Sequence, residues 1–122
     1  MNDERLRILK LLEEGKLTAE EAYKLLRAYE EDTGGVKNFV LKVKDGDETV
    51  NIKIPIPVVK ASMKLAGGIM KIVPNQVKEE LEEQNVDIQS ILDGFANSIP
   101  DKPITIMEIE DEDGTYIYMG FE

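Results

Sequence analysis

Apolar and polar positions follow two different periods along the 122 residues of the chain. Over residues 3–29, apolar side chains recur at the three- and four-residue spacing of an amphipathic helix, in two runs separated by Gly15. Gly15 can adopt the left-handed conformation that ends a helix. Thr18 and Glu21 are spaced as a capping box, which begins a helix. The pattern therefore predicts a helical hairpin, made of two short helices folded back on each other, over residues 1–33.

After a linker at Thr33-Gly34-Gly35 the period changes to two, which is typical of half-buried strands. Residues 39–54 alternate on both sides of a turn at Asp45-Gly46-Asp47. Residues 107–121 alternate on both sides of a second turn, at Asp111-Glu112-Asp113-Gly114. Two alternating runs joined by a turn that contains Asp and Gly predict a β-hairpin in each case.

The segment between the two β-hairpins has helical periodicity. A mostly apolar helix is expected at about 57–73, and Gly67-Gly68 predicts a kink, a break or a close backbone contact within it. Shorter helices are expected at about 76–84 and 87–97. The predicted fold class is α+β: the helical hairpin is followed, over residues 37–122, by a ββ-ααα-ββ two-layer domain with a four-stranded antiparallel sheet.

The period of two also assigns side chains to the two faces of the predicted sheet. The face toward the helices would carry Phe39, Leu41, Val43, Val50, Ile52, Ile54, Met107, Ile109, Ile117, Met119 and Phe121. The other face would carry Lys42, Lys44, Lys53, Glu108, Glu110, Tyr116 and Tyr118. Opposite charges on neighbouring strands stabilise a sheet by about 0.2–1 kcal/mol per pair. We therefore expect the lysine-bearing strands to lie beside the glutamate-bearing strands.

Charge is distributed unevenly along the chain. The net charge is −10, which opposes binding to nucleic acid phosphates. Residues 34–76 carry a net charge of +4, whereas residues 77–122 carry −11. A basic middle and an acidic end suggest that these two parts face each other, or face copies of each other.

The composition argues against several classes of function. Cysteine and histidine are both absent, so the chain lacks thiolate nucleophiles and the commonest ligands of transition metals. No apolar run is long enough to cross a membrane, and residues 1–4 lack the basic, apolar pattern of a secretory signal. We expect a cytoplasmic, non-enzymatic protein with no cofactor, no metal and no catalytic residue.

The helical hairpin is too small to be stable alone, since domains below about 40 residues need a staple or a partner. It could dock on its own domain, pair with a second copy or bind another protein. Because the helices expected at 57–97 could close the core of the domain, an intermolecular contact is favoured. Tyr116 and Tyr118 could mark a second contact surface or only flank the charged pairs. The candidate interaction residues are Ile8, Leu9, Leu12, Ala22, Leu25, Leu26, Tyr29, Tyr116 and Tyr118.

The run from Ile8 to Ala22, ILKLLEEGKLTAEEA, resembles the helical hairpin of SHOCT-like domains, whose pattern is roughly LL-x-x-G-x-(I/L)-T-x-E-E. The later segment Val50-Asn51-Ile52-Lys53-Ile54-Pro55 resembles small bacterial proteins of uncharacterised function that carry this hairpin at the N-terminus. Such proteins resemble components of bacterial cell-envelope stress and regulatory systems. The resemblance implies a role of the hairpin in oligomerisation or protein interaction, and it carries no catalytic residues.

Two functions are compatible with these patterns. The first is a non-enzymatic protein-interaction or oligomerisation module with a regulatory role, forming a homo-oligomer such as a dimer or binding another protein. The alternative is a domain that binds a small molecule or ion in a pocket between the sheet and the Gly67-Gly68 helix.

Overall fold

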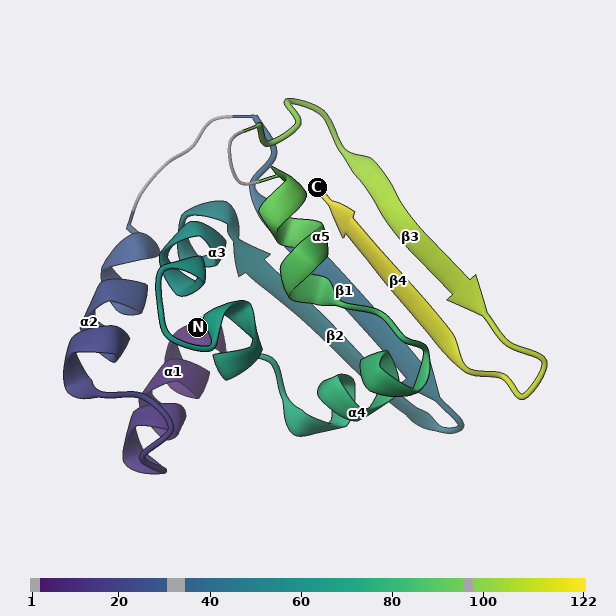
Figure 1. Ribbon diagram of the computed structural model, residues 1–122, viewed down its shortest axis with the longest axis horizontal. Coiled ribbons are helices and arrows are strands. Elements are labelled where there is room, and N and C mark those ends of the chain that lie inside the picture. The colour runs from purple at the N-terminus through teal and green to yellow at the C-terminus, as the bar shows by residue number, and fades with distance from the viewer. Residues whose placement is uncertain (1–2, 31–34, 96–97) are drawn as a thin grey trace.

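The computed structural model describes residues 3–30, 35–95 and 98–122 and confirms the predicted α+β class (Figure 1). Thr33 and Gly34 of the expected linker, and the expected helix end at 96–97, lie outside the described residues. The elements are α1 Asp3–Glu13, α2 Ala19–Ala28, β1 Asn38–Asp45, β2 Glu48–Pro55, α3 Ile56–Met63, the 3-10 helix η1 Gly68–Lys71, α4 Asn75–Glu83, α5 Ile88–Phe95, β3 Ile104–Glu110 and β4 Tyr116–Phe121.

Local sequence explains where the helices begin and end. The Thr18 hydroxyl accepts a hydrogen bond from the Glu21 N–H at 3.1 Å, and the Glu21 carboxylate accepts one from the Thr18 N–H at 2.9 Å, so the predicted capping box is formed. Asp87 caps α5 by accepting a hydrogen bond from the Ser90 N–H at 3.1 Å. Gly67 and Gly68 have φ values of +87° and +60°, which break the helix expected at 57–73 into α3 and η1.

The sheet is antiparallel with strand order β2-β1-β4-β3. Its register places the predicted apolar residues on one face, and α4 and α5 lie in front of that face, with α1 and α2 to the side (Figure 1). Phe39, Leu41, Ile117, Met119 and Phe121 are all fully buried there, so the two central strands form the floor of the core. None of the described helices lies against the other face (Figure 1).

The expectation that lysine strands lie beside glutamate strands is wrong. Lys42 and Lys44 are on β1, which lies between β2 and β4, and β4 carries the tyrosines. The glutamates are on β3, one strand further out. Residue parity determines which face a side chain occupies, whereas strand order depends on how the hairpins dock. The lysines and glutamates therefore share a face with a tyrosine strand between them.

The helical hairpin docks on its own chain, whereas the sequence favoured an intermolecular contact for its apolar stripe. Ile8, Ala22 and Leu25 are at most 1% exposed and belong to the same core cluster as the sheet. Lys71 in η1 forms an ion pair with Glu21 in α2 at 2.9 Å, and Arg7 in α1 donates a hydrogen bond to the Ile72 carbonyl. The hairpin docks because α3 has buried side chains on nearly every side, and α2 packs against it. Such a helix needs a second layer beside the sheet.

Candidate functional site

The uncovered face of the sheet brings Tyr116 and Tyr118 together with the charged residues predicted to share their face. We call this surface the outer sheet face, and it consists of two rows of side chains that run across the four strands from β2 to β3. The first row is Asn51, Lys42, Tyr118 and Glu108, and the second row is Thr49, Lys44, Tyr116 and Glu110. Each row is therefore basic on β1, aromatic on β4 and acidic on β3.

Specific contacts hold the aromatic side chains of the outer sheet face in place. The Tyr116 hydroxyl donates a hydrogen bond of 2.6 Å to Glu108, and this bond raises the pKa of Tyr116 to about 12. The ammonium group of Lys42 lies 5.4 Å from the centre of the Tyr118 ring, a cation–π distance. Both rings are thus fixed in orientation while they remain partly exposed.

Gly120 explains how Tyr118 lies over the sheet. A Cβ atom at Gly120 would be 2.7 Å from the Tyr118 hydroxyl and 2.6 Å from the Ile104 carbonyl oxygen, so the ring leans along its strand over the glycine. Val40 on β1, which is paired with Gly120, is only 1% exposed although none of the described helices covers its face. The outer sheet face therefore has a small apolar centre beneath its tyrosines.

The remaining candidate residues lie on the helical hairpin and differ in exposure. Leu9 is 47% exposed, and Leu12 and Leu26 are half-buried against the core. Tyr29 is half-buried, with the guanidinium of Arg5 at 5.5 Å from its ring centre. The structure therefore separates the predicted set, since most hairpin residues are used inside the chain and the two tyrosines lie elsewhere.

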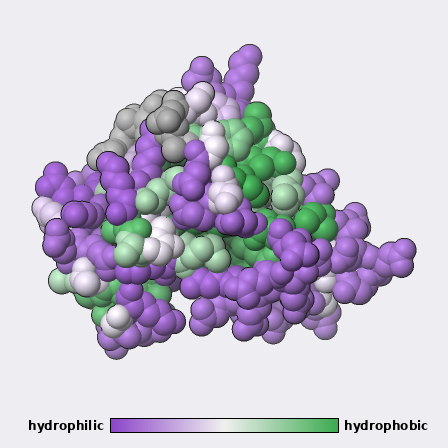
Figure 2. Space-filling model, in the orientation of Figure 1, coloured by the Kyte–Doolittle hydropathy of each residue, from purple (hydrophilic) through white to green (hydrophobic). Residues whose placement is uncertain are grey.

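The helical layer leaves part of the sheet uncovered beside α5. Figure 2 shows apolar surface over α5 and the neighbouring side of the sheet. Ile91 and Phe95 on α5 and Met107 and Ile109 on β3 are half-buried and packed against the core. The sequence pattern did not indicate this strip. Alternation predicts which residues lie on the apolar face of the sheet, but not which of those residues a helix covers.

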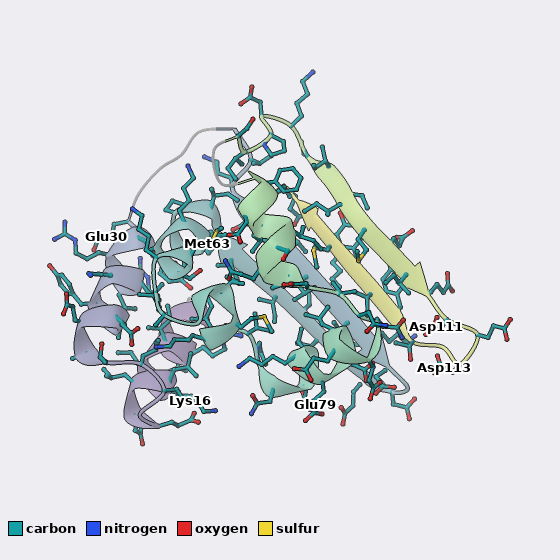
Figure 3. The ribbon with its side chains drawn as sticks, viewed as in Figure 1. Lys16, Glu30, Met63, Glu79, Asp111 and Asp113 are labelled. Atoms are coloured by element: carbon teal, nitrogen blue, oxygen red, sulfur yellow. The ribbon has the colours of Figure 1, made fainter. Side chains whose placement is uncertain are left out.

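Acidic side chains gather at the end of the molecule where the two β-hairpins turn. Glu79 lies on α4, and Asp111 and Asp113 lie in the β3–β4 turn (Figure 3). A cavity of about 220 Å³ between α4 and the β1–β2 turn is lined by residues that include Asp45, Glu48, Glu79 and Glu80. Within residues 3–30, 35–95 and 98–122, no group of three or more acidic side chains is placed to hold a metal ion.

Asp45 and Glu80 form a carboxyl pair that no sequence pattern indicates, because the two residues are 35 positions apart in the chain. A side-chain hydrogen bond with Asp45, together with partial burial and the nearby charges of Glu83 and Asp113, raises the pKa of Glu80 to about 7. Protonated Glu80 can donate to the Asp45 carboxylate and so connect α4 to the end of β1.

This pair predicts a stability that falls as pH rises. The folded-state pKa of Glu80 is above its usual value of 4.5, so its contribution is complete below pH 4.5 and is lost as pH rises through about 7. The pair is partly open to water, which screens it, so we expect a loss on the order of 1 kcal/mol. Glu80→Gln keeps a donor at every pH. Thermal unfolding should therefore show the variant more stable than the parent at pH 8 and equal to it at pH 4.

Glu79→Gln is the matched control for this prediction, because it removes the same charge from an exposed neighbour on α4. If the effect came only from repulsion among the many negative charges at this end of the molecule, both substitutions would relieve it equally. Equal dependence of stability on pH in the two variants would contradict a proton held between Glu80 and Asp45.

The space next to Gly68 is filled by a side chain of the protein. A Cβ atom at Gly68 would lie 2.0 Å from the Gln89 side-chain oxygen, and that oxygen accepts a hydrogen bond from the Ile69 N–H at 2.9 Å. The close contact that Gly67-Gly68 predicts is therefore made by α5. This removes the glycines as support for a ligand pocket between the sheet and this helix.

Comparison with known proteins confirms the resemblance that the sequence indicates. Residues 3–34 match the family model of the SHOCT-like domain, and residues 37–119 match that of the YvlB-like protein, C-terminal domain. No curated protein and no solved structure matches the chain. No helix in the described part of the chain has the length and apolar character needed to cross a membrane.

Proposed function

This chain belongs to the family of the YvlB-like protein, C-terminal domain, and we propose that it is a non-enzymatic protein-interaction module with a regulatory role. The observation that carries the proposal is the outer sheet face. It presents two half-buried tyrosines on a central strand, with lysines on one side and glutamates on the other. Tyrosine is enriched at protein interfaces because it combines a large apolar ring with a polar end.

The arrangement of the side chains supports this proposal further. Tyr116 and Tyr118 are held by contacts to Glu108 and Lys42, so little side-chain freedom would be lost on binding. The charges around them favour one orientation of a partner over others, because opposite charges must meet.

The experiment is site-specific photo-crosslinking from the full chain. A photoreactive phenylalanine analogue replaces Tyr116 on the outer sheet face, and in a matched control it replaces Tyr23, which is 59% exposed on α2. We expect covalent protein adducts from position 116 and none from position 23. Adducts from position 23 alone would move the contact to the helical hairpin. No adduct from position 116, either in the purified chain or in cells, would overturn the proposal.

Binding of a small molecule or ion is the weaker alternative, since Gln89 occupies the space at Gly68. A cytoplasmic location is part of the proposed function. Cell fractionation with a specific antibody tests it, and recovery with the membranes would contradict it.

A further inference from the structure

We propose that the partner of the outer sheet face is a second copy of this chain, related by a twofold axis that runs along β4. This inference rests on the proposed function and names the partner. It comes from the order of the strands in the sheet. The basic strand β1 and the acidic strand β3 are the two neighbours of β4, so they lie at equal distances on either side of it.

Strand spacing fixes where such an axis can lie. Neighbouring strands are about 4.8 Å apart, so the lysine strand β1 and the glutamate strand β3 each lie about 4.8 Å from β4, on opposite sides of it. Rotation by 180° about an axis parallel to β4 and in front of it exchanges the two sides. The lysine strand of one copy then faces the glutamate strand of the other, with the sheets about 10 Å apart.

The register of the sheet makes the match hold residue by residue. An axis parallel to the strands leaves the position along each strand unchanged, so each row faces the same row of the second copy. Lys42 meets Glu108 of the second copy, and Lys44 meets Glu110 of the second copy, because each pair shares a row. The reverse pairs form by symmetry, which gives four contacts between opposite charges. The tyrosines of both copies meet at the axis.

The other twofold arrangement centred on β4 brings like charges together. An axis in the plane of the interface but perpendicular to the strands would place lysine over lysine and glutamate over glutamate, which is destabilising. Among the described residues, Lys44 and Glu110 have no ion-pair partner within the chain, so these two charges are available to a second copy. Lys53 already pairs with Glu122 at 2.9 Å and takes no part.

The apolar strip beside α5 is a poorer place for a second copy. It borders β3, whose Glu108 and Glu110 would approach their own equivalents if two β3 edges paired. The residues from 77 to the end carry a net charge of −11, which adds to this repulsion. Charge therefore favours the outer sheet face.

The proposed dimer is small and depends on charge, so it should be weak and sensitive to salt. With the axis along β4, only β1, β4 and β3 of the two sheets overlap, which is less than a standard interface. We therefore expect a dissociation constant on the order of 10–100 μM at low salt. Exposed charges are screened when the Debye length shortens, from about 30 Å at 0.01 M salt to about 3 Å at 1 M. Raising the salt across this range should weaken the dimer at least about tenfold.

Sedimentation equilibrium of the full chain with reciprocal charge reversals tests the arrangement. Lys44→Glu and Glu110→Lys each turn two attractive contacts of the dimer into repulsive ones, so each variant alone should dimerise at least about tenfold more weakly. A one-to-one mixture of the two variants restores opposite charges at both contacts, and it should dimerise about as well as the parent. Both positions are exposed, and thermal unfolding of each variant confirms that it folds.

The possible outcomes separate this inference from the proposed function. A parent chain that is monomeric at about 1 mM in low salt overturns the inference, and so does a dimer that neither reversal weakens. If position 116 then crosslinks to a different protein, the proposed function stands and only the second copy is wrong. If position 116 crosslinks to nothing, both fail. Weakening by each reversal together with recovery in the mixture supports the inference.

Discussion

Leu25→Ala should lower the free energy of unfolding by roughly 3 kcal/mol, within the 2–5 kcal/mol range for buried leucines. Leu25 is 0% exposed and lies on α2, which contacts α3 of the domain. Truncation removes buried methyl groups and leaves a cavity between the helical hairpin and α3. Urea denaturation of the full chain, followed by circular dichroism, measures the effect as a shift of the midpoint.

Leu9→Ala is the matched control, because the residue type is the same and helix propensity changes little. Leu9 is 47% exposed on α1, so its truncation should cost less than about 0.5 kcal/mol. If Leu25→Ala and Leu9→Ala had equal effects, the helical hairpin would not be docked on its own chain in solution. The ion pair between Glu21 and Lys71 would then also be absent.

The elements of the fold could be predicted from the sequence because their signals are local. Alternation around Asp45-Gly46-Asp47 indicates a hairpin whatever the rest of the chain does, and the Thr18–Glu21 capping box forms between residues three positions apart. Alternation also placed Tyr116 and Tyr118 on the outer sheet face with the lysines and glutamates. The composition of the candidate site was therefore predictable.

The arrangement within the site was not predictable in the same way. Four strands from two hairpins can be ordered in several ways, and residue parity is the same in all of them. One signal does point to the relative positions of β3 and β4. Within the described sheet, β4 is the strand without a charged side chain, as suits a strand with neighbours on both sides, whereas β3 carries Glu108 and Glu110 at the edge of the sheet.

The docking of the helical hairpin also had a signal that the amphipathic pattern alone does not show. Residues 56–59 of α3 are four apolar residues in a row, and all four are buried. Four consecutive positions span more than a full turn of an α-helix, so one sheet cannot bury them all. An apolar helix of this kind predicts a second layer, which α1 and α2 supply.

Phe121→Ala should be the most destabilising of the substitutions considered, at roughly 4 kcal/mol. Phe121 is 1% exposed at the end of β4, and its ring centre lies 5.8 Å from that of Phe39 and 5.1 Å from that of Phe95. Three rings at these distances join both central strands to α5. Their loss would loosen the strand that carries Tyr116 and Tyr118 on its opposite face, although no tyrosine contact is altered directly.

Graded substitutions separate lost packing from lost aromatic contact. Phe121→Leu keeps much of the volume and should cost about 1–2 kcal/mol, while a double-mutant cycle between Phe95 and Phe121 should give a coupling energy of about 0.5–1.5 kcal/mol. Denaturant unfolding measures each term. Equal costs for Phe121→Ala and Phe121→Leu would contradict a buried ring at this position. In that case the end of β4 would be frayed, and the tyrosine strand could not hold the fixed geometry that the proposed twofold arrangement requires.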